Sequence, residues 1–377
     1  MAARDDLAFL RQLFTSGIDP VTLMPVASAC LRRLVPAFSL SMIRVDAQCA
    51  PQEHYSEFFD EFSHQLFASS GHHFAVASDD PAAFGNLLRS PRVIGNLIDT
   101  PKSYVDGATY QVLFQRNGIH HCLDVAVRDA RGPLGILGMF RERDAPGFGQ
   151  DDLTVMRTLY PFLVHAFAAR PLPASFDEID SALLVVGMDG SIHWASPQAL
   201  AWLGDATPGG DRVGLMGQGL LPAACRHLCQ RWRAGQSGRR RKSDTGEAPT
   251  LTLPLAGGRL RMRAYGLSAQ LPDAGQMPAC LGIQLSLEMH RGLRVLHVLA
   301  QQRLSPQQKR IAYALWRGDS TADIRDALGL SPHTLKSYQK DLYARLGVSS
   351  SGELARLLNE QAGSVIFDLQ RHQPRVA

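Results

Sequence analysis

The chain has 377 residues, 45% hydrophobic and 20% charged, a composition that supports two or three packed domains and argues against a disordered protein. The net charge is only +4, but residues 291–377 carry 13 Lys and Arg against 7 Asp and Glu, so a polyanion partner is expected there. Six scattered cysteines argue against a disulfide framework, the N-terminus lacks the basic and apolar runs of a signal peptide, and no apolar stretch approaches membrane-span length. These properties predict a cytoplasmic protein without a membrane partner.

Residues 1–170 are expected to form a first α+β unit. A helical pattern opens it, three strand-like stretches follow, and an amphipathic helix with acidic residues in its first turn closes it. In chain order these segments are Thr22–Pro36, Phe38–Asp46, His120–Asp129, Leu134–Glu142 and Phe148–Ala169.

Residues 177–288 are expected to form a second α+β unit, after a Pro-containing linker at Ala169–Ser175. Its signals are a hairpin around an Asp-Gly turn, two helices, two alternating strands around a Gly-Gly turn, and a last strand. These signals lie at Ser181–Ser196, Pro197–Asp205, Gly219–Gly235, Thr250–Ala269 and Ala279–Glu288.

The last part of the chain shows only helix signals. Residues 289–303 are expected to be a helical connector, and residues 304–360 to form four short helices. The first begins at Ser305, with Pro306 in its first turn and Gln308 placed to complete a capping box.

The second and third of these helices lie close together in sequence. The second is expected from Ser320 to Gly329, and the third begins at Ser331-Pro332 after the single residue Leu330. Helices joined by so tight a turn must cross at a steep angle, so the segment predicts a helix-turn-helix.

A helical wheel separates two faces of the third helix. Leu335, Leu342 and Leu346 form the expected buried stripe. The exposed side combines cations, hydroxyls and an imidazole: His333, Thr334, Lys336, Ser337 and Lys340. Lysines neutralise phosphates and short polar side chains reach base edges, so this face predicts contact with the major groove of double-stranded DNA. The alternative is an ordinary solvated surface helix.

The segment Leu304–Leu358 resembles the LuxR/GerE-type helix-turn-helix family. The matching features are Leu-Ser-Pro at its start, the glycine that ends the first helix, and the motifs Ile-x-x-x-Leu-Gly-Leu-Ser, Thr-Leu-Lys and Leu-Gly-Val-Ser. The resemblance implies that Lys336 contacts a phosphate and that Thr334, Ser337 and Lys340 lie where the family contacts DNA. Two departures are Gln308 with its neighbour Gln307, where the family usually has acidic residues, and Tyr338 in place of a frequent His.

The fourth helix carries three leucines that the resemblance assigns to a dimerising surface: Leu354, Leu357 and Leu358. A homodimer on DNA is therefore expected. The alternative is that these leucines only close the core of the helical domain.

The two front units resemble sensor families. Residues 177–288 are similar to a PAS-type sensor through Leu183–Gly204, and residues 1–170 resemble a GAF-like sensor mainly through Gly132–Phe167. Both families fold an antiparallel sheet with helices and often enclose a small-molecule pocket, so a small-molecule effector or a protein partner is expected at the front of the chain.

Other candidate sites are weaker. His72-His73, His120-His121-Cys122 and the Cys225/Cys229 pair could serve a metal or haem, but adjacent strand residues face opposite sides and the two cysteines fit a buried helix stripe. The basic run Gly238–Lys242 could touch nucleic acid or be a solvated loop. No phosphate-binding loop, nucleophile elbow or metalloprotease motif is present, so no enzyme is predicted and the cofactor is left unassigned, a haem or flavin sensor remaining open.

The sequence therefore predicts a multidomain regulator: two α+β sensor-like units, with antiparallel sheets and helices, followed by an all-α helix-turn-helix domain that binds specific DNA. A second hypothesis is a signalling adaptor, whose front units bind protein partners and whose tail is only a dimer contact.

Overall fold

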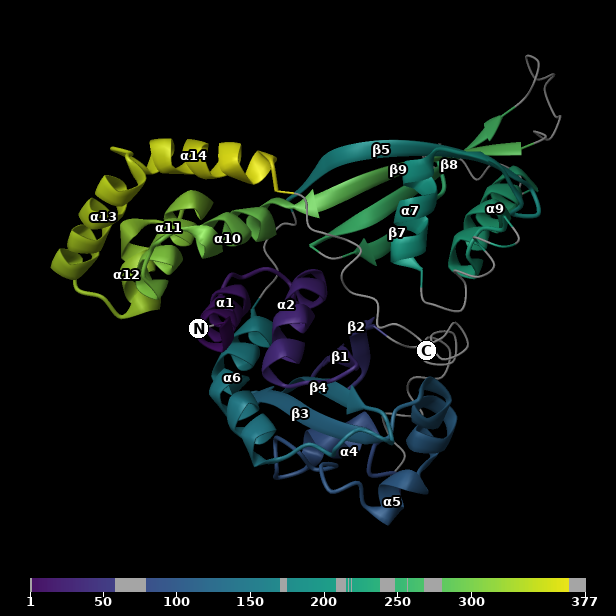
Figure 1. Cartoon of the computed structure of the whole chain (residues 1–377), viewed down its shortest axis with the longest axis horizontal. Coiled ribbons are helices and arrows are strands. Elements are labelled where there is room, and N and C mark those ends of the chain that lie inside the picture. The colour runs from purple at the N-terminus through teal and green to yellow at the C-terminus, as the bar shows by residue number, and fades with distance from the viewer. Residues whose placement is uncertain are drawn as a thin grey trace.

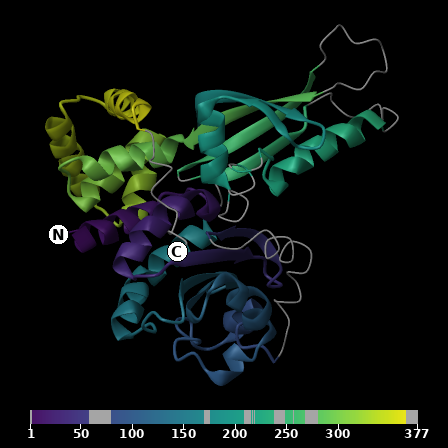
Figure 2. The same cartoon turned by 45° about the vertical axis from the view of Figure 1, so that its right-hand side comes forward.

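The computed structural model describes residues 2–57, 79–169, 175–207, 215, 217, 219–237, 248–255, 257–267 and 280–365. Two antiparallel sheets with helices are followed by a group of C-terminal helices, as the sequence predicts (Figures 1 and 2). Within these ranges no helix combines the length and the apolar character that crossing a membrane requires.

The first unit is built around a four-stranded sheet with the order β2-β1-β4-β3. Its elements are α1 (Ala2–Phe14), α2 (Pro20–Leu34), β1 (Ser39–Val45), β2 (Pro51–Ser56), α4 (Phe84–Arg89), α5 (Lys102–Val105), the π-helical turn η1 (Tyr110–Phe114), η2 (Gln115–Asn117), β3 (His121–Asp129), β4 (Gly132–Arg141) and α6 (Gln150–Ala168). The three predicted strands are confirmed. The sequence does not predict β2, because none of its side chains is buried and its sequence lacks an apolar alternation.

The two faces of this sheet pack against different helices. On β3, Leu123 and Val125 point into a cluster with α1, α2 and α6, whereas Cys122 and Ala126 point into a second cluster with α4 and η1. This division follows from the two-residue period of a strand. The first unit is thus a sheet between two helical layers.

The second unit has a five-stranded sheet with the order β6-β5-β9-β8-β7. Its elements are β5 (Phe176–Gly187), β6 (Ile192–Ala195), α7 (Pro197–Ala206), α9 (Ala223–Ser237), β7 (Thr250–Leu255), β8 (Gly258–Leu267) and β9 (Cys280–His290). Helices α7 and α9 bury Trp202, Leu203 and Leu228 against one face. The other face leaves Leu183 and Trp194 exposed.

The C-terminal helices begin directly where β9 ends. They are α10 (Arg291–Gln301), α11 (Pro306–Arg317), α12 (Thr321–Leu328), α13 (Pro332–Leu346) and α14 (Ser351–Gly363). The predicted capping box at Ser305 is confirmed: Ser305 N donates to Gln308 Oε1 at 2.8 Å, and Gln308 N donates to Ser305 Oγ at 3.2 Å.

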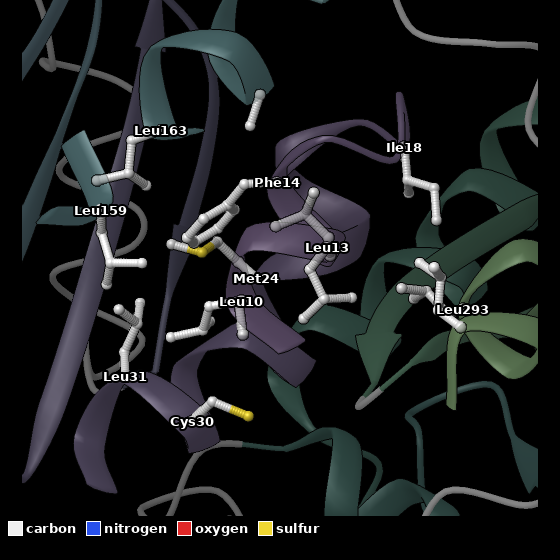
Figure 3. Packing of buried hydrophobic residues seen from close by; sticks show 14 of the residues in the cluster. Leu10, Leu13, Phe14, Ile18, Met24, Cys30, Leu31, Leu159, Leu163 and Leu293 are labelled. Carbon is white, nitrogen blue, oxygen red and sulfur yellow. The ribbon is translucent and has the colours of Figure 1, made fainter. Parts of the chain in front are cut away.

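The C-terminal helices share a hydrophobic cluster with the first unit. Leu10 and Leu13 of α1, and Ile18 in the turn that follows it, belong to the same buried cluster as Leu293 of α10 and Ile311 of α11. Figure 3 shows this packing with α1 and α2 beside α10. The helix-turn-helix segment is therefore seated on the first unit rather than attached to the chain by a tether alone.

Candidate nucleic-acid interface

The turn between α12 and α13 is fixed by local backbone signals. Gly329 ends α12 with φ +62°, a left-handed conformation that glycine adopts without a Cβ penalty. Ser331 then caps α13, its Oγ accepting the Thr334 N–H at 3.1 Å. With Pro332 at the first helical position, the start of α13 is held close to the end of α12.

Helix α13 buries one stripe and exposes the other side. Leu335 and Leu342 are 0% exposed, and Leu346 is half-buried, as the helical wheel predicts. All five predicted DNA-contacting residues are exposed and lie on the first two and a half turns of α13: His333, Thr334, Lys336, Ser337 and Lys340. The structure thus brings these side chains together on one helix, with none turned into the core.

The acidic residue of α13 is held by neighbours. The Asp341 carboxylate accepts hydrogen bonds from Gln308 Nε2 of α11 and from Arg345 Nε, the latter at 3.0 Å. Among the residues that the structure describes, no carboxylate forms an ion pair with Lys336 or Lys340. The lysine side chains are exposed, and the Asp341 carboxylate of the same helix is already partnered.

Gln308 resolves a departure from the family pattern. This glutamine stands where an acidic residue is usual, yet its amide oxygen completes the cap of α11 and its amide nitrogen reaches α13. One side chain thus performs both capping and bracing, because an amide carries an acceptor and a donor.

Helix α14 packs on the chain's own helices. Leu354 and Leu358 are 0% and 1% exposed, while Leu357 is half-buried. Trp316 Nε1 donates to Asn359 Oδ1 at 2.8 Å and fixes α14 to α11. Core closure, the alternative to a dimer contact, therefore accounts for Leu354 and Leu358, and dimerisation through α14 stays a prediction.

A contact that the sequence did not reveal joins α11 to the front of the chain. Arg317 donates from Nη1 to the Ser16 carbonyl oxygen at 3.0 Å and also pairs with Asp319. Lys309 Nζ donates to the Ala300 carbonyl oxygen at 2.7 Å, which ties α11 to α10. Nothing in the sequence around Arg317 indicates a partner 301 residues away.

The candidate metal and haem residues have other contacts. His120 Nδ1 lies 2.7 Å from the Tyr110 hydroxyl, and His121 Nδ1 lies 3.0 Å from Thr100 Oγ1. Burial raises the pKa of the Cys122 thiol well above its usual value. In the described part of the chain, no three His, Cys, Asp or Glu side chains are grouped so that they could hold a metal ion.

The remaining candidates give no second site. Cys225 and Cys229 of α9 are buried under the second sheet, with Cys225 Sγ 3.7 Å from Met262 Sδ. His72-His73 and Gly238–Lys242 lie outside the described residues.

The helices around α13 define a luxR-type domain. Residues 302–358 match the family described as bacterial regulatory proteins, luxR family, so the chain carries a helix-turn-helix domain of that family at its C-terminal end. No curated protein matches the chain.

Comparison with solved structures returns two VqmA complexes and a sensor region, all at low sequence identity and low TM-score. The complex of VqmA from Vibrio cholera with ligand and DNA is 14% identical, with a TM-score of 0.25 over 50% of this chain and 85% of that chain. The phage VqmA–DPO complex is also 14% identical, with a TM-score of 0.23 over 49% and 84% of the two chains. The sensor region of a sensor histidine kinase is 11% identical, with a TM-score of 0.19 over 76% and 91%.

Proposed function

We propose that this chain is a DNA-binding transcriptional regulator that reads specific sequences through α13 and is controlled by its two front units. The observation that carries the proposal is the luxR-family domain with an exposed polar face on α13. The second helix of a helix-turn-helix enters the major groove with its N-terminal residues at the base edges.

The five exposed residues divide by chemistry. Lys336 and Lys340 supply charge for phosphates and contribute to the salt dependence of binding. His333, Thr334 and Ser337 carry short hydrogen-bonding groups near the helix start and are placed to read base edges. The lysines therefore set affinity, and the three shorter side chains set sequence preference.

Two copies are expected on DNA. Helix-turn-helix proteins bind paired half-sites about 34 Å apart, one turn of the duplex, so a second copy places a second α13 one turn further on. A signal at the front units would change the spacing or the orientation of the two recognition helices, and so the fit to both half-sites.

The front units are proposed as sensors of the PAS-like and GAF-like kinds. Support comes from their antiparallel sheets with helical layers and from the cluster in which Leu13 and Ile18 meet Leu293. A change in the first unit has a packed route to α11, because close-packed side chains transmit displacement.

Lys336→Ala and Lys340→Ala test DNA binding. We would select a duplex from random-sequence DNA with the full-length protein, then measure affinity by fluorescence anisotropy at several salt concentrations. Each substitution is expected to weaken binding to all sequences and to reduce the salt slope by about one for each bound copy, and so by about two for a homodimer. Lys102→Ala is the matched control, because Lys102 is exposed and belongs to α5, which lies far from α13 (Figure 1).

The adaptor hypothesis predicts a different result. If the tail is only a dimer contact, the full-length protein selects no duplex, and Lys336→Ala changes no property of the chain. Selection of a consensus sequence, with a smaller salt slope in both α13 variants than in the Lys102 variant, excludes the adaptor.

A further inference from the structure

The outer face of the second sheet, opposite the face on which α7 and α9 pack, carries large apolar side chains in contact with solvent (Figure 1). Trp194 of β6 is 70% exposed and Leu183 of β5 is 55% exposed, and Tyr265 and Leu267 of β8 are exposed as well. Five large hydrophobic residues are exposed in the described part of the chain, and these are four of them. Apolar side chains gathered in this way mark an interaction surface in soluble proteins.

The strand pairing places these side chains on one face of the sheet. Val185 of β5 pairs with Trp194 of β6 and with Gly282 of β9. Gly282 in turn pairs with Tyr265 of β8, and Leu183 lies two residues before Val185 on β5. Residues that are paired across strands, or two apart along one strand, point to the same side of a sheet. The exposed apolar side chains therefore form one patch across four neighbouring strands.

A knob and a hollow lie next to each other on this face. The knob is the side chain of Trp194. The hollow is shallow, with a volume of about 420 Å³, and its walls include Ser181, Leu183, Gln284 and Tyr265. A face that carries both a projecting side chain and a recess is complementary to a second copy of itself, because a two-fold axis between them brings each knob over the partner's hollow.

The size of the face fits a stable contact between two copies. Its strands have between 4 and 12 residues. Five such strands about 4.8 Å apart, with a rise of about 3.3 Å per residue, present roughly 700 Å² in projection. Stable protein–protein interfaces bury roughly 800 Å² on each partner. This face can therefore carry most of such an interface by itself.

Helix α14, to which the family resemblance assigns dimerisation, offers less apolar surface. Leu354 and Leu358 are buried against the chain's own helices, and Leu357 is half-buried. Arg294 Nε of α10 also donates to the Val365 carbonyl oxygen at 3.2 Å, which holds the end of α14 against α10. The apolar side chains that remain free to meet a second copy lie on the sheet rather than on α14.

We propose that two copies of this chain associate through the outer faces of their second sheets, with Trp194 of each copy seated in the hollow of the other. Tryptophan and tyrosine side chains at the centre of an interface supply most of its binding energy, and Trp194 and Tyr265 lie at the centre of this patch. Only the expectation of two copies rests on the proposed DNA-binding function; the contact itself forms without DNA.

Sedimentation velocity of the full-length protein without DNA, over a range of concentrations, measures the dissociation constant of the dimer. Trp194→Ala removes the knob, and Ser181→Trp fills the hollow. Each is expected to weaken association at least roughly thirtyfold, the effect of losing a central aromatic contact. Val112→Ala on η1 is the matched control, because Val112 is the exposed hydrophobic residue that lies outside this face, and it should leave the dissociation constant unchanged.

A mixture of the two variants tests the pairing of knob and hollow. In the mixed dimer, the remaining Trp194 enters the open hollow of the other copy, and the filled hollow faces the copy that lacks the knob. An equimolar mixture is therefore expected to associate more tightly than either variant alone. Both substituted positions are exposed, and circular dichroism with thermal unfolding verifies that the variants are folded. If Ser181→Trp does not fold, Trp194→Ala decides alone.

Three results would overturn the proposal: a wild-type chain that stays monomeric at every concentration, a folded Trp194→Ala that associates as tightly as the wild type, or a mixture that associates no more tightly than its components. Lys336→Ala should associate like the wild type, which separates this contact from DNA binding. Leu357→Ala should do so too, and loss of association in that variant would place the contact on α14 instead.

Discussion

Arg317 at the end of α11 donates a hydrogen bond to the Ser16 carbonyl oxygen at 3.0 Å, joining the luxR-type domain to the turn between α1 and α2. In addition, Ile18 of the same turn and Leu293 of α10 belong to one buried hydrophobic cluster. The position of α13 therefore depends on the first unit as well as on the caps that build the helix-turn-helix.

Arg317→Ala should weaken the contact between α11 and the turn that joins α1 to α2. Loss of a charged hydrogen-bond donor at a partly buried site is expected to lower the free energy of unfolding by about 1–3 kcal/mol. Urea unfolding measures the loss, and hydrogen exchange should show faster amide exchange in residues 10–18. The control is Arg325→Ala on α12, whose guanidinium pairs with the neighbouring Asp326. Because this pair is exposed, its loss should cost less than about 0.5 kcal/mol. If both substitutions lower the free energy of unfolding equally, the hydrogen bond from Arg317 to Ser16 does not stabilise the contact between α11 and the first unit.

His290 is expected to make stability pH-dependent. Burial lowers the pKa of His290 to about 4, against the opposite influence of Asp19 and Asp177 and with a smaller lowering by Arg259. The unfolded imidazole takes up a proton below its pKa of about 6.5, while the folded one stays neutral until about pH 4. The contribution of His290 to stability is therefore complete above about pH 6.5 and is lost as the pH falls toward about 4.

The pH effect is measured by urea unfolding at about pH 7 and about pH 5. Between these two pH values, protonation of His290 in the unfolded chain is expected to lower the free energy of unfolding by about 2 kcal/mol. His290→Gln removes the titrating group, so the difference between the two pH values should shrink by that amount. Other groups that titrate in this range contribute equally to both proteins. An unchanged pH difference in the variant shows that His290 is not the group responsible.

Leu354→Ala and Leu357→Ala separate core closure from dimerisation on α14. Truncating the fully buried Leu354 is expected to cost about 2–5 kcal/mol of unfolding free energy, because it leaves a cavity between α14 and the helices beneath it. Truncating the half-buried Leu357 should cost less. Sedimentation measures the association of both variants, and a stable Leu354→Ala protein that no longer self-associates supports a dimer contact instead of a core role.

Gly329→Ala tests the turn between α12 and α13, which sets the orientation of α13 relative to α12. Among the described residues, apart from its own chain neighbours and the adjacent helix backbone, no atom lies within 4 Å of a Cβ added there. The cost therefore arises from the left-handed backbone at φ +62° and is expected to be about 1–2 kcal/mol. Gly363→Ala near the end of α14 also meets open space but has no positive φ, so it should be neutral or slightly stabilising. Thermal unfolding compares the two, and equal shifts in Tm rule out backbone strain as the cause.

The parts of the fold that depend on local chemistry could be predicted from the sequence. The hydroxyls of Ser305 and Ser331 indicate where α11 and α13 begin, because serine caps helix N-termini. The spacing of Leu335 and Leu342 fits the 3.6-residue helical period and predicts the buried stripe of α13. The exposure of Lys336 follows from the same wheel.

The features that depend on distant segments could not be predicted in this way. An arginine such as Arg317 is usually solvated, and no local pattern indicates that it meets Ser16 across 301 residues.

The cluster shared by Leu13, Ile18 and Leu293 has a practical consequence for anyone who dissects this protein. A fragment that begins after the second sheet would contain every residue of the luxR-type domain. The apolar side of α10 and α11, which α1 covers in the intact chain, would then be exposed to solvent. Such a fragment should be prone to aggregation, and its α13 should be less stably positioned. Its measured affinity for DNA would therefore be lower than that of the intact chain.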